Sequence, residues 1–552
     1  MINLKKSSFI EGTIISTVAI VVVKLLGMLY VIPFYKMVGT QGGSLYSYAY
    51  NIYNIFLDIS TAGIPIAVSK IINEYNTLGY QEAKIRTFKI GRRILMILAV
   101  VIFLTLMLFA PNIATLLLGD LEGGNTISDV TTVIRCISFA ILVVPFLSVS
   151  KGYLQGHKIF NISSLSQVIE QVIRIAVILL GSYLVVNVFD APILNAVCIA
   201  LSGAFLGGLV AYIFVAISIY RSKKSLGFIE YKKEDKITNK EIIKKIFSYA
   251  IPFIIINGIT SLYNFVDMTL ILRTLAKLNI AANTVEFIAS SIATWAPKIT
   301  MVITSMAMGL TVSLIPTIVT AFAKKDWQEV TSKLNQALQV ILFVSIPMAV
   351  GISLLSKEIW TIFYGNTMSE GAIILGLSTF SCLVANVYMV SSSTLQGLNK
   401  FKLVYKTTMT GFFLNMFLDV PLMLLFNKIG IPPYLGAITA SITGYSVSVY
   451  IALSTLKKEH NIKYKNTLNI LKKIFVPLIS MVGVVLITKL ILPVNINSKT
   501  SCIIFVTINA LLGAITYILI AYKMNIITDV FGKSTVNKII KKLTFGKVRI
   551  EK

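Results

Sequence analysis

Several ionisable side chains lie inside long apolar stretches of this sequence, and their spacing allows chemistry to be inferred. Gln167, Glu170, Gln171 and Arg174 follow one another at intervals of one to three residues. This pattern places all four on one face of a helix. Two interpretations remain open: an internal Glu170–Arg174 pair that holds helices together, or the wall of a polar cavity.

Two lysines stand alone in apolar stretches. Neither Lys24 nor Lys298 has an acidic residue within one turn along the chain. A cation at that depth needs an anion, water or a partner from another helix. We therefore expect both lysines to face a substrate, whereas Arg135 is near the end of its stretch and is expected to reach the membrane interface.

Acidic residues also occur at depth. Tyr50, Asn54, Asp58 and Thr61 form a polar stripe, which predicts either hydrogen bonds between helices or a cavity wall. Further along the chain, Asp267 and the spacing Asn415-x3-Asp419 place oxygen ligands on two apolar segments. Oxygen ligands suit a hard cation, but each carboxylate could equally bond to a neighbouring helix.

The composition indicates what must hold these residues in place. Of 552 residues, 56% are hydrophobic and only 13% are charged, against about 25% charged in soluble domains. This excludes a soluble enzyme and a disordered chain, and it predicts an all-α polytopic membrane protein. The net charge of +27 lies mostly between apolar segments, as in membrane-flanking loops, and does not indicate a nucleic-acid partner. The four single cysteines support neither a disulfide framework nor a zinc site.

The hydropathy pattern predicts about 14 transmembrane helices. Their approximate limits are 14–35, 46–69, 94–117, 131–150, 163–186, 193–219, 247–272, 287–320, 335–356, 371–395, 404–426, 432–456, 474–492 and 501–522. The first is too long for a signal-peptide core, so we expect it to be retained. Alternate loops hold most of the 50 Lys and Arg residues. By the positive-inside rule, both termini are then cytoplasmic.

An internal repeat divides the chain. Leu154-Gln155-Gly156 recurs as Leu395-Gln396-Gly397, Gln81-Glu82 recurs as Gln328-Glu329, and the run ending at Gly119 resembles the run ending at Gly365. Six spans separate the copies, so the repeat is parallel and predicts two six-helix lobes suited to alternating access. The predicted parts are an N-lobe (1–220), a cytoplasmic linker (221–246), a C-lobe (247–456), helices 13 and 14 (457–522) and a basic cytoplasmic tail (523–552).

The chain resembles the MurJ-type lipid II flippases of the MOP superfamily, in the Gram-positive branch that includes YtgP-like and sporulation-related SpoVB proteins. The stretches that carry the resemblance are VKLLGMLYVIPF (23–34), AGIPIAVSK (62–70), LVVPFLSVSKGYLQGHK (142–158), SQVIEQVIRI (166–175), SLYNFVDM (261–268) and GLTVSLIPTI (309–318). The resemblance implies two lobes around a cationic cavity and a groove beside the last two helices for a lipid tail.

The resemblance also implies roles for individual residues. Basic residues of the first and eighth helices serve the substrate diphosphate in this family, and Lys24 and Lys298 stand there. We add Arg174, Glu170, Gln171 and Asp58 as further candidates for the substrate site. The sequence departs from the family where Tyr30 and Val31 replace a basic and an acidic residue, and where Leu57 or Asp58 replaces a basic one.

A sodium site is implied in the same way. MurJ-like relatives bind Na⁺ through an acid of the seventh helix and an Asn-x3-Asp pair of the eleventh. The matching residues here are Asp267, Asn415 and Asp419, with Thr439 of the twelfth helix as a looser candidate. We expect no other cofactor.

The predicted function is a flippase, and not an enzyme, that moves a lipid-linked diphosphate sugar such as lipid II from the inner to the outer leaflet. The alternatives are a flippase for O-antigen, capsule or teichoic-type polysaccharide lipids, and a MATE-type cation-coupled exporter. A membrane-embedded glycosyltransferase would need an acid-lined metal site and a sizeable extramembrane segment, which the sequence lacks. It also lacks a Walker loop, so transport would use ion gradients or membrane potential.

We expect a monomer in the bacterial plasma membrane, in contact with membrane lipids and with a role in cell-wall synthesis, cell shape or sporulation.

Overall fold

The computed structural model describes residues 9–61, 63–119, 121–223, 226, 237–366 and 368–532. Within these ranges all regular structure is helical, and thirteen segments are long and apolar enough to cross a membrane. A further apolar helix, Val18–Leu29, is shorter. The chain is therefore an all-α polytopic membrane protein, as its composition predicts.

Helix α2 (Val31–Thr61) contains a reversal of the chain at Gly39, where φ is 66° and ψ is −165°. The hydroxyls of Tyr30 and Tyr46 lie 3.1 Å apart, although 16 residues of continuous helix would cover about 24 Å. The chain must therefore fold back between them, and glycine tolerates the positive φ at the reversal. Helix α1 (Phe9–Leu29) with the start of α2 then forms the first span. The rest of α2 with α3 (Ile64–Leu78) forms the second, and the number of spans agrees with the predicted fourteen.

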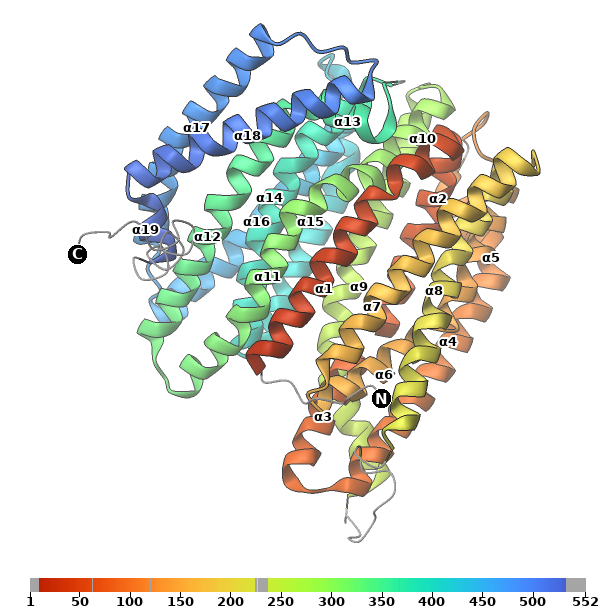
Figure 1. Ribbon diagram of the computed structural model, residues 1–552, viewed down its shortest axis with the longest axis vertical. Coiled ribbons are helices and arrows are strands. Elements are labelled where there is room, and N and C mark those ends of the chain that lie inside the picture. The colour runs from red at the N-terminus through yellow and green to blue at the C-terminus, as the bar shows by residue number, and fades with distance from the viewer. Residues whose placement is uncertain are drawn as a thin grey trace. The chain divides into compact units, whose positions relative to one another are not determined.

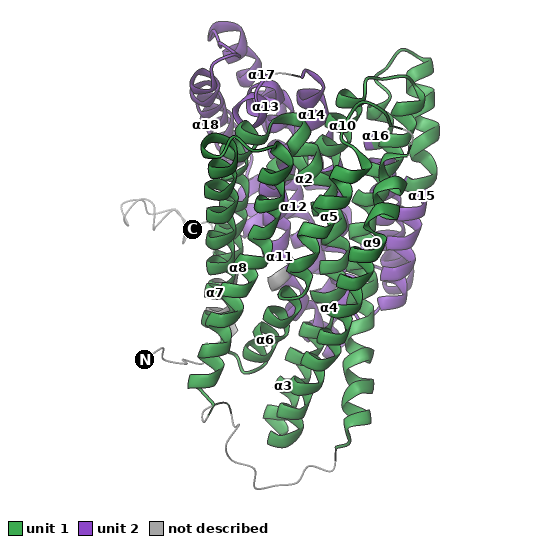
Figure 2. Ribbon diagram, turned by 90° about the vertical axis from the view of Figure 1, so that its right-hand side faces the viewer, with its two compact units in different colours: residues 1–299, 416–437 green, residues 300–415, 438–552 purple. Residues whose placement is uncertain are grey.

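The described residues form two compact units (Figure 2). Unit 1 comprises residues 1–299 and 416–437. Besides α1 to α3 it contains α4 (Gln81–Leu118), α5 (Ile127–Ile141), α6 (Val144–Gly156), α7 (Phe160–Ala176), the π-helical turns η1 (Val177–Gly181) and η2 (Leu184–Val188), α8 (Ile193–Arg221), α9 (Asn239–Lys277), α10 (Ala282–Ser290) and the π-helical turn η3 (Ser291–Trp295). Helices α1 and α7 pack side by side in this unit (Figure 1).

Unit 2 comprises residues 300–415 and 438–552. It contains most of α11 (Ala296–Ala323), then α12 (Trp327–Leu354), α13 (Ser356–Tyr364), α14 (Glu370–Gly397), the first half of α15 (Phe401–Lys428), most of α16 (Tyr434–His460), α17 (Lys465–Ile491), α18 (Lys499–Lys523) and α19 (Ile526–Phe531). Helices α17 and α18 form an antiparallel pair in this unit (Figure 1).

The unit boundary differs from the predicted lobe boundary, because α9 packs on α2, α3 and α4 and α10 packs on α2. Packing in space and repetition in the sequence are different properties, so the two-lobe division at 220–247 stays a prediction. Residues 224, 225 and 227–236 of the predicted linker (221–246), and the predicted tail beyond residue 532, lie outside the described residues.

The repeat is visible in the backbone. Residues with positive φ recur at matching places in the two halves: Gly79 with Lys325, Gly119 with Gly365, and Lys158 with Asn399. The last pair follows the repeated Leu-Gln-Gly sequence. The N–H of Lys158 donates to the carbonyl of Gln155 at 2.9 Å, and the N–H of Asn399 donates to the carbonyl of Gln396 at 3.0 Å. The two halves thus end corresponding helices with the same local turn.

The eighth predicted span is continuous despite its prolines. Pro297 and Pro316 both lie inside α11, and the irregularity is instead the π-helical turn η3 directly before them. A π-helical turn inserts a residue into the helix and changes the direction of the side chains that follow. It therefore sets the direction in which Trp295 and Lys298 point.

Candidate functional site

The predicted substrate lysine Lys298 lies in unit 1 and is buried, with 8% of its surface exposed. Its ammonium lies 4.7 Å from the ring centroid of Tyr50 and 5.6 Å from that of Tyr30. Among the described residues no ion pair includes Lys298 or Lys24. Aromatic faces attract a cation without neutralising it, so the positive charge of Lys298 remains available to an anion.

Two further cations stand close to Lys298. Lys24, on α1, is near enough to interact electrostatically with both Lys298 and Tyr50. Arg174, on α7, interacts with the hydroxyls of Tyr46, Tyr50 and Tyr53. Residues that are distant in the sequence thus meet at one face of α2.

Two members of the predicted stripe on α7 form an ion pair that has a third partner. Arg174 Nη2 lies 2.8 Å from Glu170 Oε1, and Lys151 Nζ of α6 lies 4.0 Å from Glu170 Oε2. We call Lys24, Lys151, Arg174, Lys298 and Glu170 the cationic cluster. Its four cations face a single carboxylate, so the cluster keeps an excess of positive charge.

The other two predicted substrate residues make contacts elsewhere in unit 1. Gln171 is buried on α7, and its Nε2 is close to Gly27 of α1, where an added Cβ would lie 3.3 Å away. Asp58 accepts a hydrogen bond from Ser261 of α9. It lies two helical turns beyond Tyr50, about 12 Å along α2. Each of these contacts joins two helices of unit 1, and a role of either residue in the substrate site stays a prediction.

The structure brings two acids of the predicted cation site together. The carboxyl groups of Asp267 and Asp419 interact directly within unit 1. Asp419 is fully buried, and neither of its oxygens receives a hydrogen bond from a donor in the described part of the chain. Asn415 precedes Asp419 by one turn of α15 but falls in unit 2, as does Thr439. Among the described residues no three His, Cys, Asp or Glu side chains form a metal-binding group.

An apolar cavity of about 430 Å³ lies in unit 2 between α12, α17 and α18. Residues that line it include Phe343, Pro347, Gly351, Met481, Val485, Gly513, Ala514 and Tyr517. The polar groups in its wall are engaged within the protein. The Tyr517 hydroxyl donates to the Phe343 carbonyl at 2.9 Å, and Asn509 bonds to Thr488 and the Phe505 carbonyl. The cavity therefore suits a hydrocarbon chain.

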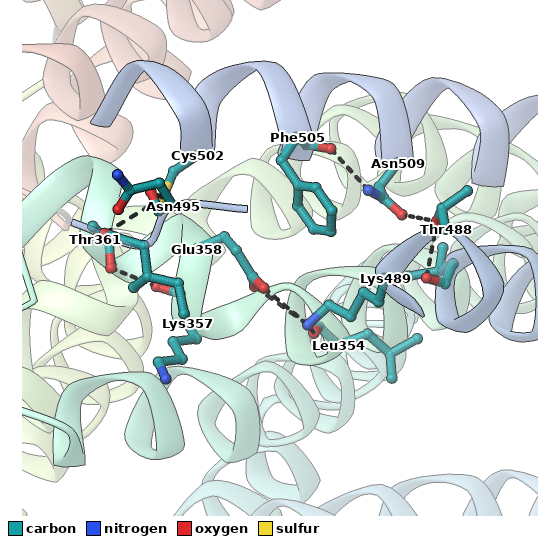
Figure 3. Close-up of polar contacts among 12 residues, drawn as sticks. Leu354, Lys357, Glu358, Thr361, Thr488, Lys489, Asn495, Cys502, Phe505 and Asn509 are labelled. Atoms are coloured by element: carbon teal, nitrogen blue, oxygen red, sulfur yellow. Dashed lines mark hydrogen bonds and ion pairs between the residues drawn. The ribbon is translucent and has the colours of Figure 1, made fainter. Parts of the chain in front are cut away.

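An ion pair stands beside this cavity (Figure 3). Lys489 of α17 lies 3.1 Å from Glu358 Oε1 of α13, and its ammonium donates to the Leu354 carbonyl at 2.6 Å. Glu358 is only 4% exposed. A buried carboxylate needs such a partner, so this pair fixes α17 against α13, and the bond to Leu354 holds α17 against the end of α12.

Two features of unit 1 are not apparent from the sequence. One is the aromatic group around Lys298, in which Tyr46 stacks on both Tyr50 and Trp295 at 5.6 and 5.9 Å. The spacing of Tyr46, Tyr50 and Tyr53 is a helical signal that could have indicated it. The other is Glu286 of α10, 1% exposed, which accepts hydrogen bonds from Asn125. These partners are 161 residues apart, so no local pattern predicts the contact.

The family described as "Polysaccharide biosynthesis protein" matches residues 9–322, which is more than half of the chain. The chain belongs to this family. The family described as "MatE" matches residues 259–420. The lipid II flippase MurJ of Bacillus subtilis is 33% identical over 471 residues, covering 83% of this chain and 84% of the relative. The stage V sporulation protein B of the same organism is 22% identical, covering 66% of this chain and 68% of the relative.

Solved structures agree with this membership at the level of the fold. An inward-facing MATE family transporter of the MOP superfamily superposes with a TM-score of 0.61 at 16% identity. The match covers 79% of this chain and 96% of that one. The chain is thus a MurJ-type member of the MOP superfamily with the transporter fold of that superfamily.

Proposed function

We propose that this protein is a flippase that moves an undecaprenyl-diphosphate-linked cell-wall precursor, lipid II, from the inner to the outer leaflet by alternating access. The observation that carries the proposal is the buried ammonium of Lys298, which has two tyrosine rings beside it and, among the described residues, no carboxylate within ion-pair distance. Lys24 and Arg174 add positive charge at the same place. An anionic head group would supply the counter-charge that the protein does not.

The relatives support this choice of substrate. The lipid II flippase of Bacillus subtilis is similar over most of both chains, whereas the MATE structures share the fold at low identity. A cavity for organic cations would be expected to hold an excess of acids. The cationic cluster, with four cations and one carboxylate, has the opposite balance.

The cavity of unit 2 would serve the polyprenyl tail. It is lined by apolar side chains of α12, α17 and α18, and its polar wall groups are bonded within the protein. When a hydrocarbon chain fills the cavity, the polar groups of the wall keep their hydrogen bonds within the protein. The hydrocarbon chain itself stays in an apolar environment. Diphosphate and tail would thus be recognised by different chemistry.

Membrane potential would drive the cycle. An anion that leaves a negative-inside cell gains about 2.3 kcal/mol per charge per 100 mV. The same field returns the empty, positively charged cluster inward. The chain's own residues therefore supply both binding and response to the field.

A bound Na⁺ is the second part of the proposal. Asp267 and Asp419 offer oxygen ligands, and the donor-free oxygens of Asp419 fit a hard cation. Asn415 and Thr439 belong to unit 2, so their participation stays a prediction. The ion would offset the repulsion between two adjacent buried carboxylates and neutralise one of their two charges.

Complementation tests the proposal. The host's essential lipid II flippase is depleted, this chain is expressed, and growth and lipid II in the outer leaflet are measured. Restored growth with restored outer-leaflet lipid II is the expected result. A well-inserted protein that restores neither would overturn the assignment to lipid II. Restored export of another polysaccharide lipid would then favour the broader activity that the family description suggests.

A further inference from the structure

Tyr50 differs from the neighbouring tyrosines of α2. Tyr46 and Tyr53 lie about one turn before and after it and are 3% and 1% exposed, whereas Tyr50 is half-buried. Its ring stacks on Tyr46 at 5.6 Å with an interplanar angle of 14°. The Lys298 ammonium lies 4.7 Å from the ring centroid. The ring is therefore held in place while part of the residue remains accessible.

The Tyr50 hydroxyl is the point on which three cations act together. Lys298, Arg174 and Lys24 all interact with it electrostatically, and the Lys298 ammonium lies over the ring of the same residue. These cations come from α11, α7 and α1, so their charges surround the hydroxyl from separate helices. Because electrostatic potentials add, a negative charge next to this hydroxyl is stabilised by all three cations at once.

A phenol is suited to this place. Its oxygen can accept a hydrogen bond from the Lys298 ammonium while its proton is donated to another acceptor. A phosphate oxygen is a strong acceptor for such a proton, and the bond is strengthened by the phosphate charge. A carboxylate at the same position would instead repel the anion.

We propose that the Tyr50 hydroxyl donates a hydrogen bond to the diphosphate of the substrate and so selects a diphosphate over a monophosphate. A diphosphate can present one phosphate group to the hydroxyl and a second phosphate group to the surrounding cations, whereas a monophosphate presents only one group. The inference rests on the proposed function, and it places the diphosphate of the substrate next to Tyr50.

Tyr53 supplies a matched control on the same helix. Arg174 also interacts with it, but its hydroxyl is buried and has no hydrogen-bond partner among the described residues. Removing the Tyr53 hydroxyl deletes the same chemical group as removing the Tyr50 hydroxyl, but at a buried position that a substrate does not reach. Tyr50→Phe and Tyr53→Phe each keep the ring, so stacking and cation–π contacts persist in both variants.

The test measures binding of undecaprenyl diphosphate and undecaprenyl monophosphate to the purified full-length chain. We expect the wild type to prefer the diphosphate. We expect Tyr50→Phe to weaken diphosphate binding about tenfold or more, with little effect on the monophosphate. Tyr53→Phe should bind both lipids like the wild type, and all three proteins should have the same melting temperature.

The outcomes separate this inference from the proposed function. Diphosphate binding by the wild type that Tyr50→Phe leaves unchanged overturns the role of Tyr50 alone. An equal loss of affinity for both lipids in Tyr50→Phe also overturns the selectivity. A wild type that binds neither polyprenyl phosphate overturns the proposed function, and the inference with it.

Discussion

The hydroxyl of Ser47 on α2 lies 2.6 Å from the hydroxyl of Thr294 in η3. Ser44 and Ser290 make a similar contact at 3.1 Å, and Asn51 donates to Thr294 at 2.8 Å. These contacts form a buried polar seam between two segments that lie in different halves of the sequence repeat. Short polar side chains can exchange such bonds for bonds to water at little net cost, so the seam can open reversibly.

A disulfide across this seam should stop transport. We expect Ser47→Cys combined with Thr294→Cys to form a disulfide on oxidation, because their side-chain oxygens are already in contact. The background should lack Cys136 and Cys198, whose thiols contact one another. Flipping should cease on oxidation and return on reduction. Undiminished flipping by the fully cross-linked protein would mean that α2 and η3 stay together during the cycle.

The seam also illustrates what the sequence can and cannot predict. Apolar segments and charge asymmetry predict the spans well, since each is a local property of the chain. Repeated turns at Lys158 and Asn399 follow from a repeated sequence. Ser47 and Thr294 are 247 residues apart, and nothing near either residue indicates its partner. The same holds for Asp58, whose hydrogen-bond partner Ser261 lies 203 residues away along the chain.

The sequence could predict that Lys24 and Lys298 are isolated cations, because their lack of acidic neighbours is a local property of the chain. Lys24 and Lys298 have no acidic neighbour along the chain, and neither lysine forms an ion pair among the described residues. The aromatic rings around Lys298 were missed because rings in an apolar segment usually indicate core packing. Only their approach to the ammonium gives them an electrostatic role.

Reversing the charge of either lysine should abolish flipping. Lys24→Glu and Lys298→Glu replace attraction for a diphosphate by repulsion, with each interaction worth about 4 kcal/mol near 4 Å. Lys→Arg variants should keep part of the activity, and both Glu variants should still insert. Arg135→Gln is the control, because Arg135 is exposed and bonds to the Met107 carbonyl. Normal outer-leaflet lipid II in both Glu variants would remove the lysines from the substrate site.

Filling the cavity of unit 2 should impair transport without unfolding the protein. Gly351 lines this cavity, and a Cβ at Gly351 would meet no atom within 4 Å. Gly351→Leu therefore occupies the space intended for a lipid tail, and leucine favours the helix over glycine by somewhat less than about 1 kcal/mol. Gly483→Leu on α17 is the matched control, since Gly483 has equal space and does not line the cavity. Similar flipping rates in the two variants, measured at equal protein levels, would argue against a tail in this cavity.

Cysteine labelling should establish the orientation of the chain. Glu122, in the loop between α4 and α5, and Lys465, at the start of α17, are both exposed. If both termini are cytoplasmic, a membrane-impermeant reagent should label Glu122→Cys in intact cells. It should label Lys465→Cys only after permeabilisation, and the reverse pattern would invert the topology.

Sodium should stabilise the protein through Asp419. The two oxygens of this buried side chain receive no hydrogen bond from the described residues, and the Asp267 carboxyl lies next to them. A cation bound there affects only the folded state, and at a hundred times its dissociation constant it adds about 2.7 kcal/mol. We expect the melting temperature of the purified protein to be higher in NaCl than in KCl at equal ionic strength. Asp419→Asn keeps the shape but removes the charge, so its melting temperature should be the same in both salts. If the wild type also melts equally in the two salts at high concentration, the paired carboxyls share a proton or bond to one another without Na⁺.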